Sequence, residues 1–193
     1  MEALRCVLRQ DPDVMMVGEI RDGETAQIAC RSALTGVLVL STLHAHNSAA
    51  AVDVLEDFGV PRGIIADCLR GIVSQRLVLQ VCKEHRETYH PDEAACQMLG
   101  LDSSSADSIN LVRGLPADIN FRTGYSGRTG IFEIMEMNKD LRQGILRGDS
   151  ANELMDVAER DGMKTLYSAL RSKLLAGVTS MDQYHAATLT FGN

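Results

Sequence analysis

The stretch 11–22, which reads DPDVMMVGEIRD, decides the fold. Its centre, Val14–Val17, is an unbroken apolar run that follows an Asp-Pro-Asp turn. Such a run predicts a central strand buried on both faces, of the kind found in parallel α/β sheets. Glu19 comes almost directly after this strand. In open parallel sheets, ligands bind at that end of the strands, so the sequence predicts a functional site there.

The residues that follow alternate between helical and strand patterns. Asp22 can cap a helix whose apolar residues recur at helical spacing and which Gly36 ends. Residues Val37–Leu43 predict a second buried strand, and Ser48 can cap the next helix. The β-α-β-α order indicates parallel strands joined by right-handed crossovers.

The remainder of the chain changes character twice. A helix from Pro61 to about Ser74 and a short strand at Arg76–Val81 complete the first part. Residues 82–128 are rich in Ser, Asp and Gly and predict an inserted, loop-rich lobe. After a strand at Gly130–Glu136, helices return, and leucines 166, 170 and 174 line one helix face. We therefore predict three parts, at residues 1–81, 82–128 and 129–193.

Two capping boxes support the helices of the last part. They read Ser150-x-x-Glu153 and Ser180-x-x-Gln183, in which a hydroxyl and a carboxylate or amide satisfy the first backbone groups of a helix. We expect this part to form a small helical subdomain without chemistry of its own.

Composition excludes several classes of protein. The formal net charge of the 193 residues is −7 and no block of Lys or Arg occurs, which argues against a general surface for nucleic acid or for an anionic membrane. No apolar run approaches the roughly 18 to 20 residues that span a bilayer, and the N-terminus lacks the pattern of a secretory signal. We expect a cytoplasmic protein whose five cysteines are free thiols.

Two polar clusters follow the predicted strands, at Glu19–Asp22 and at Thr42–His46. A carboxylate such as Glu19 can orient an attacking water in phosphoryl transfer, and His44 can donate a hydrogen bond to a phosphate oxygen. Both residues also have plainer interpretations, because solvated carboxylates and structural histidines are common at strand ends. Periodicity alone does not decide between these interpretations.

The amino-acid sequence of the whole segment around Glu19 favours the chemical interpretation. Leu4-Arg5-x3-Leu8-Arg9 and the residues up to Asp22 closely resemble the Walker B region of the type II secretion and type IV pilus assembly ATPases. Further segments that resemble blocks of this family are Ala33–His44, which is similar to its His box, Ser74–Val78, and Gly124–Glu133. The resemblance covers nearly the whole chain.

The resemblance implies part of a RecA-like ATPase core and a role for several residues. Glu19 corresponds to the catalytic Walker B glutamate and His44 to the His-box histidine. Arg21, Asp22 and Thr42 are expected to support or sense the nucleotide. The full-length family protein is a homo-hexamer that uses ATP and Mg²⁺, lies at the inner face of the cytoplasmic membrane and drives assembly of a pilus or pseudopilus through a platform protein.

The sequence departs from the family pattern in three ways. It contains no Gly-x4-Gly-Lys-Ser/Thr loop for the phosphates, so we expect an inactive fragment whose Met1 is an internal start. Val37 stands where the His box has a second histidine. The two Cys-x-x-Cys pairs of a zinc site are reduced to Cys82-x-x-His85 and Leu115-x-x-Asp118.

A closed structural zinc site needs four donors. Cys82, His85 and Asp118 supply three, with Cys96 or His90 as a distant fourth, so we do not expect zinc. Retention of the lobe favours the secretion or pilus-extension branch of the family over the retraction branch.

Three functions remain open at this stage. The first is a motor-ATPase fragment that works only within its parent hexamer. The second is a non-catalytic module that docks onto intact ATPase subunits or the platform protein, and the third is an unrelated nucleotide-binding or helicase-type domain.

Overall fold

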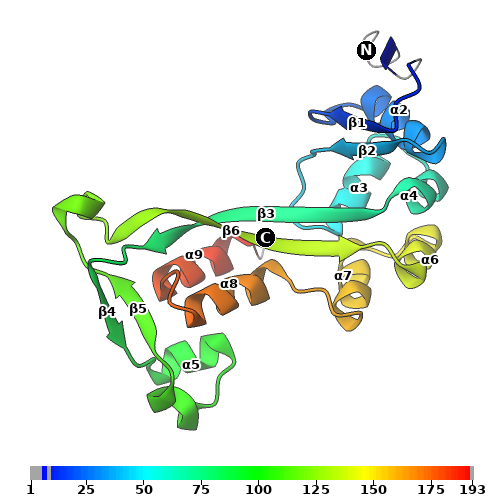
Figure 1. Ribbon diagram of the computed structural model, residues 1–193. Coiled ribbons are helices and arrows are strands. Elements are labelled where there is room, and N and C mark those ends of the chain that lie inside the picture. The colour runs from blue at the N-terminus through cyan, green and yellow to red at the C-terminus, as the bar shows by residue number, and fades with distance from the viewer. Residues whose placement is uncertain (1–5, 8–9, 192–193) are drawn as a thin grey trace. The chain divides into compact units, whose positions relative to one another are not determined.

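The computed structural model describes residues 6–7 and 10–191 (Figure 1). Met1, Leu4, Arg5, Leu8 and Arg9, which the sequence interpretation used, lie outside the described residues. Contacts divide the chain into two compact units, residues 1–74 with 134–163 and residues 75–133 with 164–193. The three parts predicted from the sequence have other boundaries and stay a prediction.

The first unit is an α/β arrangement around one short parallel sheet. Its elements are β1 (Val14–Val17), α2 (Gly23–Leu34), β2 (Leu38–Ser41), α3 (Ala50–Asp57), α4 (Arg62–Cys68), α6 (Lys139–Arg147) and α7 (Ala151–Arg160). β1 and β2 are parallel, with Val14 opposite Leu38 and Met16 opposite Leu40. The predicted strand at Val14–Val17 and its parallel pairing are confirmed, and so is the mixed α/β class.

Helix α2 begins and ends as its sequence predicts. The extended backbone of Asp22 places its carboxylate to accept a hydrogen bond from the Thr25 amide at 2.8 Å. Ala26, Ala29 and Cys30 are buried on the face that packs into the core. The chain leaves the helix through Gly36, whose φ of +106° suits a residue without a Cβ.

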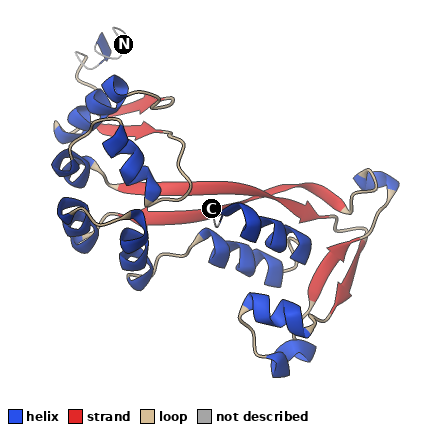
Figure 2. Ribbon diagram, turned by 180° about the vertical axis from the view of Figure 1, so that it is seen from behind, coloured by secondary structure: helices blue, strands red, loops and turns tan. Residues whose placement is uncertain are grey.

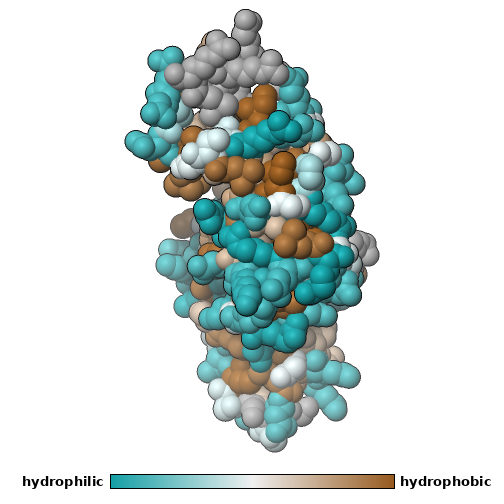
Figure 3. Space-filling model, turned by 90° about the vertical axis from the view of Figure 1, so that its right-hand side faces the viewer, coloured by the Kyte–Doolittle hydropathy of each residue, from teal (hydrophilic) through white to brown (hydrophobic). Residues whose placement is uncertain are grey.

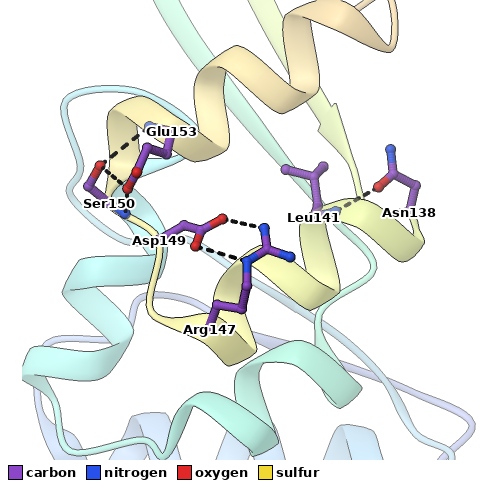
Figure 4. A network of polar contacts seen from close by, with 6 residues as sticks. All are labelled: Asn138, Leu141, Arg147, Asp149, Ser150 and Glu153. Carbon is purple, nitrogen blue, oxygen red and sulfur yellow. Dashed lines mark hydrogen bonds and ion pairs between the residues drawn. The ribbon is translucent and has the colours of Figure 1, made fainter.

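The corner between α6 and α7 is fixed by local polar contacts, drawn in Figure 4. Asn138 caps α6 by accepting from the Leu141 amide at 2.9 Å. Ser150 and Glu153 form the predicted capping box of α7, which is thereby confirmed. Buried apolar side chains beneath this corner, among them Ile65, Leu141, Ile145 and Leu154, belong to the core of the first unit.

Two predicted boundaries in this unit are wrong. Ser48 does not cap α3, because the Asn47 side chain accepts from the Ala50 amide at 2.8 Å while Ser48 is buried beside two methionine sulfurs. The helix after Pro61 ends at Cys68 rather than near Ser74. Leu69 is extended, with ψ of 131°, which ends the helical run.

The expectation that β1 is buried on both faces is also wrong. Four side chains on one face of the sheet are exposed by half or more, namely Val14 (57%), Met16 (74%), Leu38 (50%) and Leu40 (52%). Among the described residues β1 pairs only with β2, and α2 packs beside β2. The sequence pattern predicts the apolar strands β1 and β2 correctly. The burial of their side chains, however, depends on what covers the faces of the sheet. Figure 3 draws one side of the surface, where hydrophilic side chains surround smaller apolar groups.

The second unit is built on antiparallel strands and helices, coloured by type in Figure 2. Its elements are β4 (Arg86–Tyr89), α5 (Glu93–Leu99), the 3-10 turns η1 (Ser103–Ser108) and η2 (Asp118–Asn120), β5 (Leu111–Gly114), α8 (Leu166–Leu175) and α9 (Met181–Phe191). β4 and β5 are antiparallel. The long strands β3 (Gly71–Val81) and β6 (Tyr125–Glu136) pair with each other and run through both units.

The helices predicted as one C-terminal subdomain are thus divided between the units. Leu166, Leu170 and Leu174 of α8 are buried together, as their spacing predicts. The second capping box is only half present, because the Gln183 side chain accepts from the Leu79 amide. None of the described helices combines the length and apolar character that crossing a membrane requires.

Candidate functional site

The loops that follow β1 and β2 are tied to each other. The Ile20 amide donates to the Thr42 carbonyl at 2.9 Å. The Thr42 hydroxyl donates to the Gly18 carbonyl at 2.8 Å. These two bonds hold the residue between them, Glu19, at the carboxyl end of the parallel sheet. The site predicted from the sequence is therefore assembled from both loops.

Arg21 holds one oxygen of the Glu19 carboxylate. Its Nε donates to Oε2 at 2.6 Å, and Nη2 contacts the same oxygen. The hydrogen bond and charge of Arg21 lower the pKa of Glu19, and Glu19 in turn raises the pKa of Arg21. The side chain of Glu19 is only 20% exposed, whereas that of Arg21 is 78% exposed. The carboxylate is therefore kept ionised at the margin of solvent.

His44 lies on the other oxygen of Glu19. Its Nε2 is 2.9 Å from Oε1, while the imidazole itself is 95% exposed. Oε1 is buried and, apart from this contact with His44, has no hydrogen-bond partner among the described residues. A buried carboxylate oxygen in this state can accept from a water or a ligand donor placed between the two strand ends.

Asp22 has a structural role in this arrangement, as the N-terminal cap of α2. Its carboxylate accepts from the first turn of α2, and the Thr25 amide lowers its pKa. It thereby fixes the start of the helix that follows the Glu19 loop. The structure thus places four of the five predicted residues, Glu19, Arg21, Thr42 and His44, in one cluster, and Asp22 at its border.

The weaker metal candidates do not come together. Cys82 is buried with Sγ 3.4 Å from a Glu84 carboxylate oxygen, His85 is exposed, and Asp118 pairs with Arg122. Cys96 is fully buried in α5. Across residues 6–7 and 10–191, no three His, Cys, Asp or Glu side chains are grouped as metal ligands.

A buried asparagine that the sequence interpretation overlooked organises the same lobe. Asn120 is 1% exposed, and its Oδ1 accepts from the amides of Ala117 at 3.0 Å and Gly124 at 3.2 Å. Its Nδ2 donates to the Leu115 carbonyl at 2.9 Å. This side chain joins both ends of the turn in which the family pattern has its second cysteine pair. A lone Asn among turn residues gave no sequence signal for it.

A pocket of about 260 Å³ lies elsewhere in the first unit. Its lining includes Asn138, Leu141, Asp161 and Met163 at the start of α6 and the end of α7. None of its lining residues belongs to the Glu19 cluster, so it does not extend the candidate site.

Comparison with known proteins identifies the family. The family model described as "Type II/IV secretion system protein" matches residues 1–186. The chain belongs to this family. It is 42% identical over 187 residues to the type IV pilus assembly ATPase PilB of Thermus thermophilus, covering 97% of this chain and 21% of PilB. It is 39% identical to the type II secretion system protein E of Pseudomonas aeruginosa, covering 93% of this chain and 35% of that protein.

Solved structures support the fold of this family member. The ATPase DotB of Legionella pneumophila superposes with a TM-score of 0.62 at 22% identity, over 96% of this chain and 41% of DotB. DotB of Yersinia pseudotuberculosis superposes with a TM-score of 0.67 at 17% identity, over 97% and 40%. The chain spans about a fifth to a third of the length of these two curated relatives.

Proposed function

We propose that this chain is the Walker B and His-box part of a hexameric motor ATPase. In this proposal, ATP hydrolysis drives assembly of a pilus or pseudopilus through an inner-membrane platform protein, and the protein lies in the cytoplasm at the inner face of that membrane. The observation that carries the proposal is Glu19, an ionised carboxylate at the ends of two parallel strands with one buried oxygen that has no hydrogen bond among the described residues. Membership of the family supports it.

Each residue of the cluster has a part in the proposal. Glu19 Oε1 orients the attacking water and takes up its proton, which suits a carboxylate held charged. His44, at 2.9 Å from that oxygen, reports on the γ-phosphate through its exposed imidazole. Arg21 holds the second oxygen and is a positioning residue. Thr42 fixes the backbone before Glu19 through the Gly18 carbonyl.

The residues present fit ATP and Mg²⁺ only in part. Bound Mg²⁺ would neutralise charge on the phosphate oxygens, and Oε1 of Glu19 suits a water of its shell. The cradle of backbone amides, the Lys and the metal-binding hydroxyl of a phosphate loop do not occur in the 193 residues. We infer that the other half of the site comes from outside this sequence and that the isolated chain does not turn over ATP.

The exposed sheet face is consistent with such an incomplete site. Val14, Met16, Leu38 and Leu40 form one apolar face at the strands that carry Glu19 and Thr42. Apolar faces of parallel sheets are normally covered. In the parent ATPase this face would pack against the part that carries the phosphate loop.

A chimera tests the proposal. The corresponding segment of the Thermus thermophilus PilB is replaced by residues 1–193, and ATP turnover is measured beside the isolated chain. The proposal expects turnover by the chimera and none above background by the isolated chain. Turnover by the isolated chain, or a folded hexameric chimera without any turnover, would contradict it.

The exposed face also favours a second function, a non-catalytic module that docks onto intact ATPase subunits or the platform protein. This function expects the isolated chain to co-purify with a full-length ATPase and to lower its turnover in mixed hexamers. It also expects the chimera to be inactive. The chimera therefore separates the two candidates.

A further inference from the structure

One face of helix α2 packs closely against the chain that leads into α4. Gly23 comes so near the end of α3 that a Cβ on it would lie 2.4 Å from the Phe58 carbonyl oxygen. One turn later, the Gln27 side-chain amide donates to the Gly59 carbonyl at 3.4 Å. Cys30 follows on the same side of α2, because residues at i, i+4 and i+7 share one face of a helix. The closely packed face therefore includes a thiol.

This thiol meets a second one, that of Cys68, the last residue of α4. The side chains of Cys30 and Cys68 are hydrogen-bonded to each other within the apolar core of the first unit. They are 6% and 9% exposed, so each keeps a small opening to solvent, whereas Cys82 and Cys96 are 1% and 0% exposed. Because Leu69 is already extended, Cys68 stands at a helix end that can adjust to the geometry of a disulfide.

The hydrogen bond makes the two thiols unequal. It lowers the pKa of Cys30 and raises the pKa of Cys68, as expected when the Cys68 thiol donates to the Cys30 sulfur. The thiolate is the form of cysteine that reacts with oxidants. Cys30 is therefore the sulfur that should react first, and the Cys68 thiol is placed to react with its product.

We propose that Cys30 and Cys68 form a reversible disulfide when the protein meets hydrogen peroxide. The Cys30 sulfur attacks one peroxide oxygen, the O–O bond breaks, and the other oxygen leaves as water with the thiol proton. The Cys68 sulfur then displaces the hydroxyl group from the sulfenic acid at Cys30, and a second water leaves with the Cys68 proton. Two thiols thus lose two electrons to one peroxide. The inference does not depend on the proposed ATPase role.

The disulfide would join α2 to α4. Helix α2 begins after its cap Asp22, close behind Glu19 in the chain, so the cross-link restrains the helix that follows the candidate site. A bond between residues 30 and 68 also closes a loop in the unfolded chain, which favours the folded state. Oxidation should therefore raise the urea concentration at which the first unit unfolds, and dithiothreitol should return it to its starting value.

Peroxide treatment of the full chain tests the proposal. The background variant is Cys6→Ser, because Cys6 is the exposed thiol among the five and could pair between molecules. Thiols that remain after treatment are alkylated in urea, and trypsin places Cys30 and Cys68 in separate peptides, 22–31 and 63–70. We expect these two peptides to be cross-linked, the mass of the chain to fall by two hydrogens, and dithiothreitol to reverse both changes.

Further substitutions in the same background assign the order of the two thiols. In Cys68→Ser the sulfenic acid at Cys30 should persist and be trapped by dimedone, whereas Cys30→Ser should leave Cys68 reduced. Cys96→Ser, at the buried thiol of α5, is the matched control and should keep the cross-link. Circular dichroism identifies any variant that does not fold, and peptide mapping of the Cys6→Ser chain decides without these variants. A disulfide with another partner, further oxidation of Cys30 without a cross-link, or two unreacted thiols overturns the proposal.

Discussion

The Arg21 Nε donates a 2.6 Å hydrogen bond to Oε2 of Glu19, the carboxylate that we propose as catalytic. The other oxygen, Oε1, faces the exposed His44 imidazole at 2.9 Å. Arg21 thus fixes one oxygen, whereas the other lies beside His44 and has no further partner among the described residues. The proposed function depends on this difference between the two oxygens of the Glu19 carboxylate.

Arg21→Ala should raise the pKa of Glu19 toward its ordinary value, because the hydrogen bond from Arg21 is the largest cause of the lowered pKa. A lowered folded pKa means that the ionised carboxylate stabilises the fold above the ordinary carboxyl pKa. That contribution is lost as pH falls through the folded pKa. Carboxyl-carbon NMR titration measures the shift. Arg147→Ala is the control, and an unchanged Glu19 titration in Arg21→Ala would contradict the pairing.

Asn120→Ala should destabilise the second unit by about 2–4 kcal/mol, because it leaves the buried Gly124 amide, the partly buried Ala117 amide and a carbonyl without their partner. Urea denaturation followed by circular dichroism measures the free energy of unfolding. Asn110→Ala, at an exposed position of the same lobe, should change it by less than about 0.5 kcal/mol. Equal effects of the two substitutions would show that Asn120 does not hold the turn.

Leu40→Asp tests the exposed sheet face. Because Leu40 is 52% exposed, the isolated chain should keep its fold with a loss of no more than about 1 kcal/mol. In the chimera with PilB the same substitution should abolish ATP turnover. There the apolar face would pack against the part that carries the phosphate loop, so the new charge would be buried. Leu170→Asp, which places a charge in the core, should unfold the isolated chain. Full activity of a Leu40→Asp chimera would argue that this face stays open.

The thiols should react unequally with Ellman's reagent. Of the five, Cys6 is exposed and the other four are buried. The hydrogen bond with Cys30, together with burial, raises the pKa of Cys68 and slows its reaction further. We expect one fast equivalent that Cys6→Ser removes. Two or more fast equivalents in the native chain would show that the core around α2 and α4 opens readily.

The parts of the fold that sequence patterns predicted are those with local causes. The cap at Asp22, the spacing of α2 and the apolar run of β1 each act within a few residues. The predictions were wrong where contacts between residues far apart in the sequence determine the structure. The position of Ser48 predicts a helix cap, but Met155 and Met163, over a hundred residues away, lie against its side chain. The exposure of Met16 likewise depends on what covers the sheet.

The candidate site was predictable to a similar degree. Strand ends and the family resemblance indicated Glu19, Arg21 and His44, which the fold does gather. The bond from the Thr42 hydroxyl to the Gly18 carbonyl depends on strand register, which no short pattern shows. Asn120 was missed because its importance comes from three backbone partners rather than from its neighbours in sequence.

The most direct test of the central claim is the turnover number of the PilB chimera carrying Glu19→Gln. This change keeps the shape of the side chain but removes the charge that accepts a proton. We predict that kcat falls by about 100-fold or more while the hexamer and ATP binding persist. Glu159→Gln, on the exposed face of α7, should leave kcat within about twofold. A Glu19→Gln chimera with unchanged kcat would contradict the assignment of Glu19 as the catalytic carboxylate.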